Sequence, residues 1–197
     1  MSDPDIPPII EQSFLGNTIT VTVLLFLVAI VIGWIGTAHN PEIGNELLQM
    51  FQKEIVGQIT ISNPIDMCLN IFANNLEACI LLFLGGASFG ILTMVILSLN
   101  GIVIGAITEI ISKGHSVIFI AAAIVPHGIF EIPAFIIASA LGFHLGQSLI
   151  AEWYGAADTA IDAARLARLF LMFVVPLIAV AAVVEAFITP AIIHIVA

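Results

Sequence analysis

Residues 116–150 read SVIFIAAAIVPHGIFEIPAFIIASALGFHLGQSLI, an apolar run interrupted at Pro126-His127-Gly128 and again at Pro133. As one straight α-helix this run would measure about 52 Å, whereas the hydrocarbon core of a bilayer is about 30 Å thick. It is too long for one crossing and too short for two. We therefore predict a broken, re-entrant helix, with a half-helix over 116–125 and a returning helix over about 128–150, surrounded by protein or a polar cavity.

The composition places the whole chain in a membrane. Of its 197 residues, 60% are hydrophobic and 9% are charged, against about 45–50% and about 25% in soluble domains. The mean hydropathy is +1.18. A water-soluble globule, a disordered chain and a secreted disulfide scaffold are excluded. Cys68 and Cys79 lie in or beside one apolar stretch and are expected to be thiols that face other helices.

We predict an all-α, polytopic transmembrane helical bundle, formed as one integral membrane domain over residues 1–197. The expected spans are 18–37, 65–84, 88–112, the broken segment 116–150, and 168–189. Residues 41–63 have apolar side chains at helical spacing between polar ones and are expected to form an amphipathic interfacial segment. Residues 151–167 are expected to form an interfacial loop or a short surface helix.

The charge balance restricts the partners and suggests an orientation. Four basic and 14 acidic residues give a formal net charge of −10, which excludes nucleic acid as a partner. If 116–150 re-enters, all the basic residues fall on one side, which the positive-inside rule makes cytoplasmic, with both termini outside the cell membrane. These residues are Lys53, Lys113, Arg165 and Arg168.

A few polar side chains lie inside the predicted spans, where a charged group costs about 2.5–3.5 kcal/mol on insertion scales. Glu77 lies near the middle of its span, and His127 and Glu131 lie one helical turn apart at the break. Amide partners are available from Asn74, Asn75 and Asn100. We predict that these six residues form a buried polar centre. Glu185, counted from the start of the last span, is placed nearer the far interface.

Three interpretations of this centre stay open. It is a structural polar network, an ion or proton site, or a metal centre in which Glu77, His127 and Glu131 bind a divalent cation such as zinc. The string H-x-x-x-E lacks the second histidine of H-E-x-x-H. No other cofactor is expected.

Pairs of glycines four residues apart recur three times, and small residues at this spacing let helix backbones approach closely in lipid. Either they pack helices within the chain or one pair forms a dimer seam. The pairs are Gly86/Gly90, Gly101/Gly105 and Gly142/Gly146.

The ordered set of these motifs resembles the stage II sporulation protein M family over roughly residues 60 to 150. The set consists of Phe72-Ala73-Asn74-Asn75, Gly86-x-x-x-Gly90, Leu99-Asn100-Gly101 with Gly105, Pro126-His127-Gly128-x-x-Glu131-x-Pro133-Ala134, and Gly142-x-x-x-Gly146. The resemblance implies a small multi-pass membrane protein. It also implies a scaffold that, in engulfment by spore-forming bacteria, holds peptidoglycan-degrading partners at the septum. The family's polar motif would fall on Asn74, Asn75, Asn100, His127 and Glu131.

The expected function is therefore that of a non-enzymatic membrane scaffold or assembly protein, in contact with membrane lipid and with other membrane proteins, and forming a homo-oligomer. Two alternatives are a cation or proton transporter or channel that uses the buried Glu and His side chains, and an intramembrane metal-dependent hydrolase. Unpaired acids at a broken helix favour the first alternative.

Overall fold

The computed structural model describes residues 8–40, 42, 46, 63–114 and 116–196, and its described residues form helices without any strand. The elements are α1 (Pro8–His39), α3 (Pro64–Leu84), η1 (Gly85–Ser88), α4 (Ile91–Ser112), α5 (Val117–Trp153), α6 (Thr159–Leu169), η2 (Phe170–Val174), α7 (Val175–Val183), η3 (Val184–Ile188) and α8 (Thr189–Val196). The predicted all-α helical bundle is confirmed. The predicted amphipathic segment 41–63 lies almost entirely outside the described residues.

The second span follows its sequence signals closely. Asn63 caps α3 by accepting a hydrogen bond on Oδ1 from the Ile65 amide at 3.1 Å, and Pro64 occupies the first turn. The helix ends at Leu84, with Gly85 as its C-cap, so a helix occupies the residues of the predicted span 65–84 and begins one residue earlier. α1 contains the residues of the predicted first span. α4 forms most of the predicted third span 88–112, whose first three residues lie instead in η1 and in the corner before α4.

A tight corner joins α3 to α4. After η1 the backbone enters the left-handed region at Phe89 (φ +57°) and Gly90 (φ +82°). The buried hydroxyl of Thr93 donates to the carbonyl of Leu82 at 2.8 Å, which ties the start of α4 to the end of α3. The corner is therefore a fixed element, built from one strained residue, one glycine and one buried hydroxyl.

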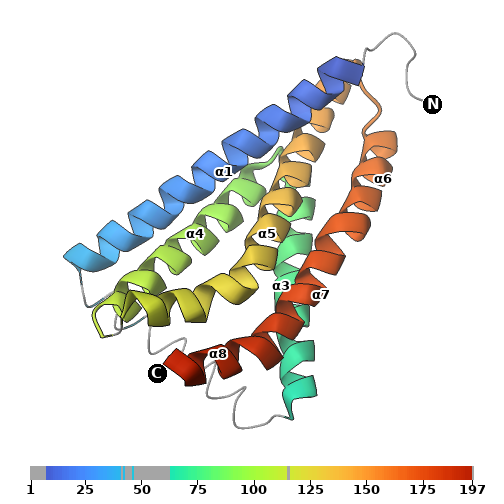
Figure 1. Ribbon diagram of the computed structural model, residues 1–197. Helices are drawn as coiled ribbons and strands as arrows, with labels where there is room; N and C mark the ends of the chain where they lie inside the picture. Colours follow the sequence, from blue (N-terminus) through green and yellow to red (C-terminus); the bar gives the residue numbers. More distant parts are fainter. Residues whose placement is uncertain (1–7, 41, 43–45, 47–62, 115, 197) are drawn as a thin grey trace.

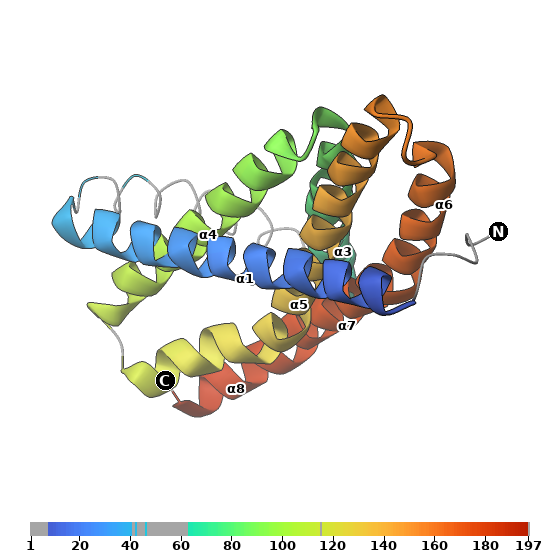
Figure 2. The ribbon, with the colours of Figure 1, turned by 90° about the horizontal axis from the view of Figure 1, so that it is seen from above.

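The structure contradicts the predicted re-entrant hairpin at 116–150. α5 is one continuous helix, with Pro126 and Pro133 inside it. It bends strongly instead of returning: its first part runs across one end of the bundle and its second part rises through the middle (Figures 1 and 2). Each proline removes one helical hydrogen bond without ending the helix, which produces a bend. The part that is long and apolar enough to cross a membrane is Gly128–Trp153.

The last helix also differs from the expected interfacial segment followed by a span over 168–189. Asp158 caps α6 through Oδ1, which accepts from the amides of Ala160 and Ile161 at 3.0 and 3.2 Å. From Thr159 the chain stays helical to Val196, with two π-helical turns, η2 and η3, inserted on the way. Its last part, α8, lies beside the first part of α5 (Figures 1 and 2).

Five helical stretches in the described part of the chain are long and apolar enough to cross a membrane. They are Gly16–His39, Pro64–Ser88, Ile91–Ser112, Gly128–Trp153 and Thr159–Ile192. α1 begins at the end of the bundle opposite the end of α8 (Figure 1). If each of the five stretches crosses once, the two ends of the described chain lie on opposite sides, whereas a re-entrant hairpin would place both termini on one side. Lys113, after α4, and the arginines of α6 also fall toward opposite ends, so the described basic residues do not all lie on one side. Lys53 lies outside the described residues.

α5 is the central helix of the bundle. In its crossing part 56% of the apolar window is buried, against 17–28% in the other four spans. The core around it includes side chains with no exposed surface, such as Leu82, Leu97 and Ile178. The outer helices instead present large apolar side chains outward, which suits a bundle surrounded by lipid.

Candidate functional site

The bend of α5 carries an acidic side chain. Glu131 lies between the two prolines, which lack the N–H groups that would otherwise pair with the carbonyls of Ala122 and Ile129. Its carboxyl is half-buried. The backbone next to the Glu131 carboxyl group therefore lacks two hydrogen-bond donors.

Two groups from other helices lie within electrostatic reach of Glu131. One is the thiol of Cys79 on α3, which has no exposed surface, and the other is the carboxyl of Glu185 on η3. Three segments far apart in the sequence therefore meet at this point. We call the set of Glu131, Glu185 and Cys79 the elbow cluster.

Glu185 reaches this position from a π-helical turn. In η3 the backbone bonds run from each residue to the fifth one before it, and the Thr189 hydroxyl likewise donates to the carbonyl of Val184 at 3.2 Å. A π turn adds a residue to the helix and rotates the side chains that follow it. Counting along a regular helix from Arg168 gives a depth for Glu185 but does not indicate that it faces Glu131.

The predicted polar centre is only partly assembled. Glu77 and Asn74 are exposed, so the expectation that they are buried is not met in this chain. Two residues along a helix are about 200° apart, so Glu77 points away from the face on which Cys79 enters the core. Asn75 and Asn100 are half-buried, and the Asn100 amide donates to the carbonyl of Ile96 in its own helix at 2.9 Å.

His127 lies in α5, but its side chain is outside what the structure describes. Among the described residues, no three His, Cys, Asp or Glu side chains are placed to hold a metal ion. The set of Glu77, His127 and Glu131 with a divalent cation stays a prediction.

The predicted packing glycines lie where two helix backbones of the same chain approach closely. A Cβ at Gly101 would lie 2.7 Å from the Ala29 Cβ, and one at Gly105 would lie 2.8 Å from the Trp34 amide nitrogen, so both face α1. A Cβ at Gly142 would lie 2.8 Å from Thr93 Oγ1.

The remaining glycines complete the contact between α5 and the corner. Gly86 faces Gly142 and Leu145, a Cβ at Gly146 would lie 2.8 Å from the Gly90 nitrogen, and one at Gly90 would lie 3.0 Å from the Phe143 ring. All six predicted packing glycines thus lie at contacts inside one chain. A larger residue at Gly142 would disturb the fold itself, so that helix face is not available as a dimer seam.

Comparison with known proteins gives one family. The model of the family described as stage II sporulation protein M matches residues 22–190. An uncharacterized protein of Methanocaldococcus jannaschii is 29% identical over 176 residues, which cover 87% of this chain and 93% of that protein. A second uncharacterized protein of the same organism is 27% identical over 134 residues, 67% of this chain and 59% of its own length. No solved structure matches.

Proposed function

The chain belongs to the stage II sporulation protein M family, and from this premise we propose that it is a non-enzymatic scaffold of the cell membrane that assembles other membrane proteins around its helical bundle. The observation that carries this proposal is that small and large residues occupy different surfaces of the helices. The glycines of the three pairs are used inside the chain, while large apolar side chains cover the outward faces of the helices.

Such a surface suits lateral contact with other transmembrane helices. Leu99 on α4 and Leu171 in η2 are both more than half exposed. In lipid, helices associate through van der Waals packing and hydrogen bonds, and a rigid bundle offers a fixed surface for that packing. A second copy of this chain and other membrane proteins are the partners that we propose.

Photo-crosslinking in native membranes tests the proposal. A photoreactive amino acid at Leu99 or Leu171 should give an adduct of one reproducible mass, either a dimer or a complex with one partner protein. The matched control is Leu97, two residues before Leu99 on the same helix and fully buried, which should give no intermolecular adduct. Adducts with lipid alone at both exposed positions would contradict a scaffold role.

One observation favours a second candidate, the transport of protons or cations. Two carboxyl groups from different helices lie within electrostatic reach inside the bundle, and acids at membrane depth are typical of such pathways. Flux into proteoliposomes that Glu131→Gln abolishes and Glu77→Gln leaves intact would contradict a purely structural role. Glu77 is a matched control because it carries the same charge but is exposed, on the face of α3 opposite to that of Cys79. The hydrolase alternative is not favoured, because Glu77 points away from the elbow cluster.

A further inference from the structure

A row of polar side chains runs along the exposed face of α3. Asp66, Asn70, Asn74 and Glu77 are all exposed. Their spacing of four, four and three residues places them within an arc of about 80°, because successive residues of a helix are about 100° apart. The side chains by which α3 enters the core lie on the other side of the helix. We call these four polar residues the α3 stripe.

Most of the α3 stripe lies in hydrocarbon wherever the bilayer is placed along the span. The span Pro64–Ser88 has 25 residues, and about 20 helical residues cross the hydrocarbon core. Every stretch of about 20 residues within the span contains Asn70, Asn74 and Glu77. In each such stretch Glu77 falls within the middle third, so it lies near mid-depth.

The side chains of the α3 stripe are not satisfied within the described part of the chain. Among the described residues, no hydrogen bond or ion pair reaches any of the four. The exposed side chains of the next span, α4, are all apolar, and the half-buried Asn100 amide in α4 donates to a carbonyl of its own helix. Hydrocarbon offers neither donors nor acceptors, so polar groups at this depth require a partner.

Charge complementarity indicates the chemistry of that partner. The α3 stripe holds two carboxyl groups, two amides and no basic group. Two copies of the chain that met through this stripe would share one orientation, so Glu77 would face the same carboxyl group of the other copy at the same depth. A cation at that depth compensates the carboxylate instead. The amides can both donate and accept hydrogen bonds.

The described basic residues of a second copy lie at other depths. The rings of Phe83 in α3 and Phe170 in η2 are 5.5 Å apart, so these two residues share one level. The two helices run in opposite directions (Figure 1), which places Arg168 about 3 Å above that level and Glu77 about 9 Å below it. The other arginine of α6 lies farther still, and Lys113 forms an ion pair within its own helix.

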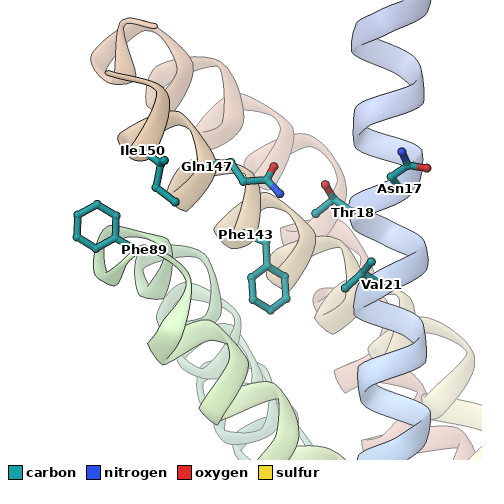
Figure 3. A pocket seen from close by; sticks show the side chains of 7 residues that line it. All are labelled: Asn17, Thr18, Val21, Phe89, Phe143, Gln147 and Ile150. Atoms are coloured by element: carbon teal, nitrogen blue, oxygen red, sulfur yellow. The ribbon is translucent and has the colours of Figure 1, made fainter. Parts of the chain in front are cut away.

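We propose that the α3 stripe binds a transmembrane helix of another protein. This helix carries a lysine or arginine at the depth of Glu77, and hydrogen-bonding side chains about one and two turns away that meet Asn74 and Asn70. The pocket of about 280 Å³ shown in Figure 3 is a different feature, lined by α1, the corner and α5. The inference rests on the proposed scaffold function, since it assigns a surface and a chemistry to one partner.

Binding of synthetic transmembrane peptides to the full-length chain in liposomes tests the proposal, with energy transfer between two fluorophores as the readout. The probe is a polyleucine helix of about 20 residues with a central lysine and an asparagine one turn to each side. Two control peptides have leucine or glutamate in place of the lysine. The lysine peptide should bind about tenfold more tightly than either control, the effect of one strong interhelical contact in lipid.

Variants of exposed residues identify the binding surface. Glu77→Gln should weaken binding of the lysine peptide about tenfold, and Asn74→Leu about threefold, the average effect of an interhelical hydrogen bond in lipid. Glu77→Lys should reverse the preference, so that the glutamate peptide binds and the lysine peptide does not. Glu152→Gln removes another exposed carboxyl group, at the end of α5, and should leave binding unchanged.

Equal binding of the lysine and leucine peptides, or binding that Glu77→Gln leaves unchanged, would overturn the proposal. In native membranes, a photoreactive amino acid at Ala73, exposed one turn from Glu77, should crosslink to a peptide that has lysine or arginine within an apolar run. An adduct with a second copy, or with residues 41–62 of the same chain, would also overturn it. Reproducible adducts from Leu99 or Leu171 beside any of these failures would remove this inference alone and leave the scaffold role in place.

Discussion

Gly33→Ala should weaken the contact between α1 and α4, whereas Gly36→Ala, one turn later in the same helix, should not. A Cβ at Gly33 would overlap the carbonyl oxygen of Ile102 and lie 2.7 Å from its carbonyl carbon and 2.8 Å from its Cα. Nothing lies within 4 Å of a Cβ at Gly36. The two substitutions therefore differ only in what the new methyl group meets.

The size of the difference follows from this geometry. Both variants gain the same helix propensity, about 0.5–1 kcal/mol for Gly to Ala, and this gain cancels in the comparison. What remains is the cost of separating two helix backbones, for which forced overpacking gives about 1–3 kcal/mol. We expect Gly33→Ala to unfold more easily than Gly36→Ala by that amount.

Reversible unfolding of the purified chain by SDS in mild detergent measures this difference. Ile102→Ala in the Gly33→Ala background should not restore stability, because the overlap is with the backbone of Ile102 and not with its side chain. Free energies of unfolding for Gly33→Ala and Gly36→Ala that agree within about 0.5 kcal/mol, the usual effect of a neutral surface change, would refute the close backbone contact. A full rescue by Ile102→Ala would refute its assignment to the backbone.

Three smaller changes test other parts of the bundle by the same unfolding assay. Thr93→Val should lower the free energy of unfolding by about 1 kcal/mol, because the Leu82 carbonyl at the corner loses its buried hydroxyl donor. An unchanged unfolding midpoint would mean that the corner does not depend on this bond. Asp158→Ala should lose about 1 kcal/mol with its two cap hydrogen bonds to α6, and Asp158→Asn should retain most of it. Ser148→Ala should lower the free energy of unfolding by about 1–3 kcal/mol, since Asp162 loses a buried hydroxyl donor that joins α5 to α6. A variant as stable as the wild type would mean that this bond does not form in the folded protein in solution.

The sequence predicted the elements whose ends are marked by local chemistry. Asn63-Pro64 and Gly85 are signals of the start and end of a helix, and α3 begins and ends there. The glycine spacing likewise indicated close backbone contacts, although not which helices would meet. These features could be predicted because they depend on a few neighbouring residues.

The bends could not be predicted in the same way. The length of 116–150 indicated that a straight perpendicular helix would not fit, but a hairpin and a bent helix satisfy the same length. Packing of the first part of α5 beside α8 accompanies the bend, and this contact lies far away in the sequence. The π-helical turn at Glu185 has no clear local signature, so its rotation toward Glu131 was missed.

One signal could have identified the elbow cluster. The predicted spans contain acids, but their one basic residue is Arg168, at the first position of the last span. An acid at membrane depth requires a partner or a proton. If Glu131 and Glu185 are treated as partners of each other, instead of each being assigned a separate depth, the sequence predicts that their two helices are in contact. Cys79 could not have been identified, because its thiol is one of many small apolar groups along α3.

The single crossing of α5 is the central claim, because it sets the five-span topology. Lys113 and Tyr154, which flank α5, are both exposed and can each be replaced by cysteine. A membrane-impermeant maleimide applied to sealed vesicles, with the wild-type chain as blank, reports the side on which each lies. The structure predicts that one position reacts in intact vesicles and the other only after permeabilisation. Reaction of both from the same side would contradict a single crossing and support a returning hairpin.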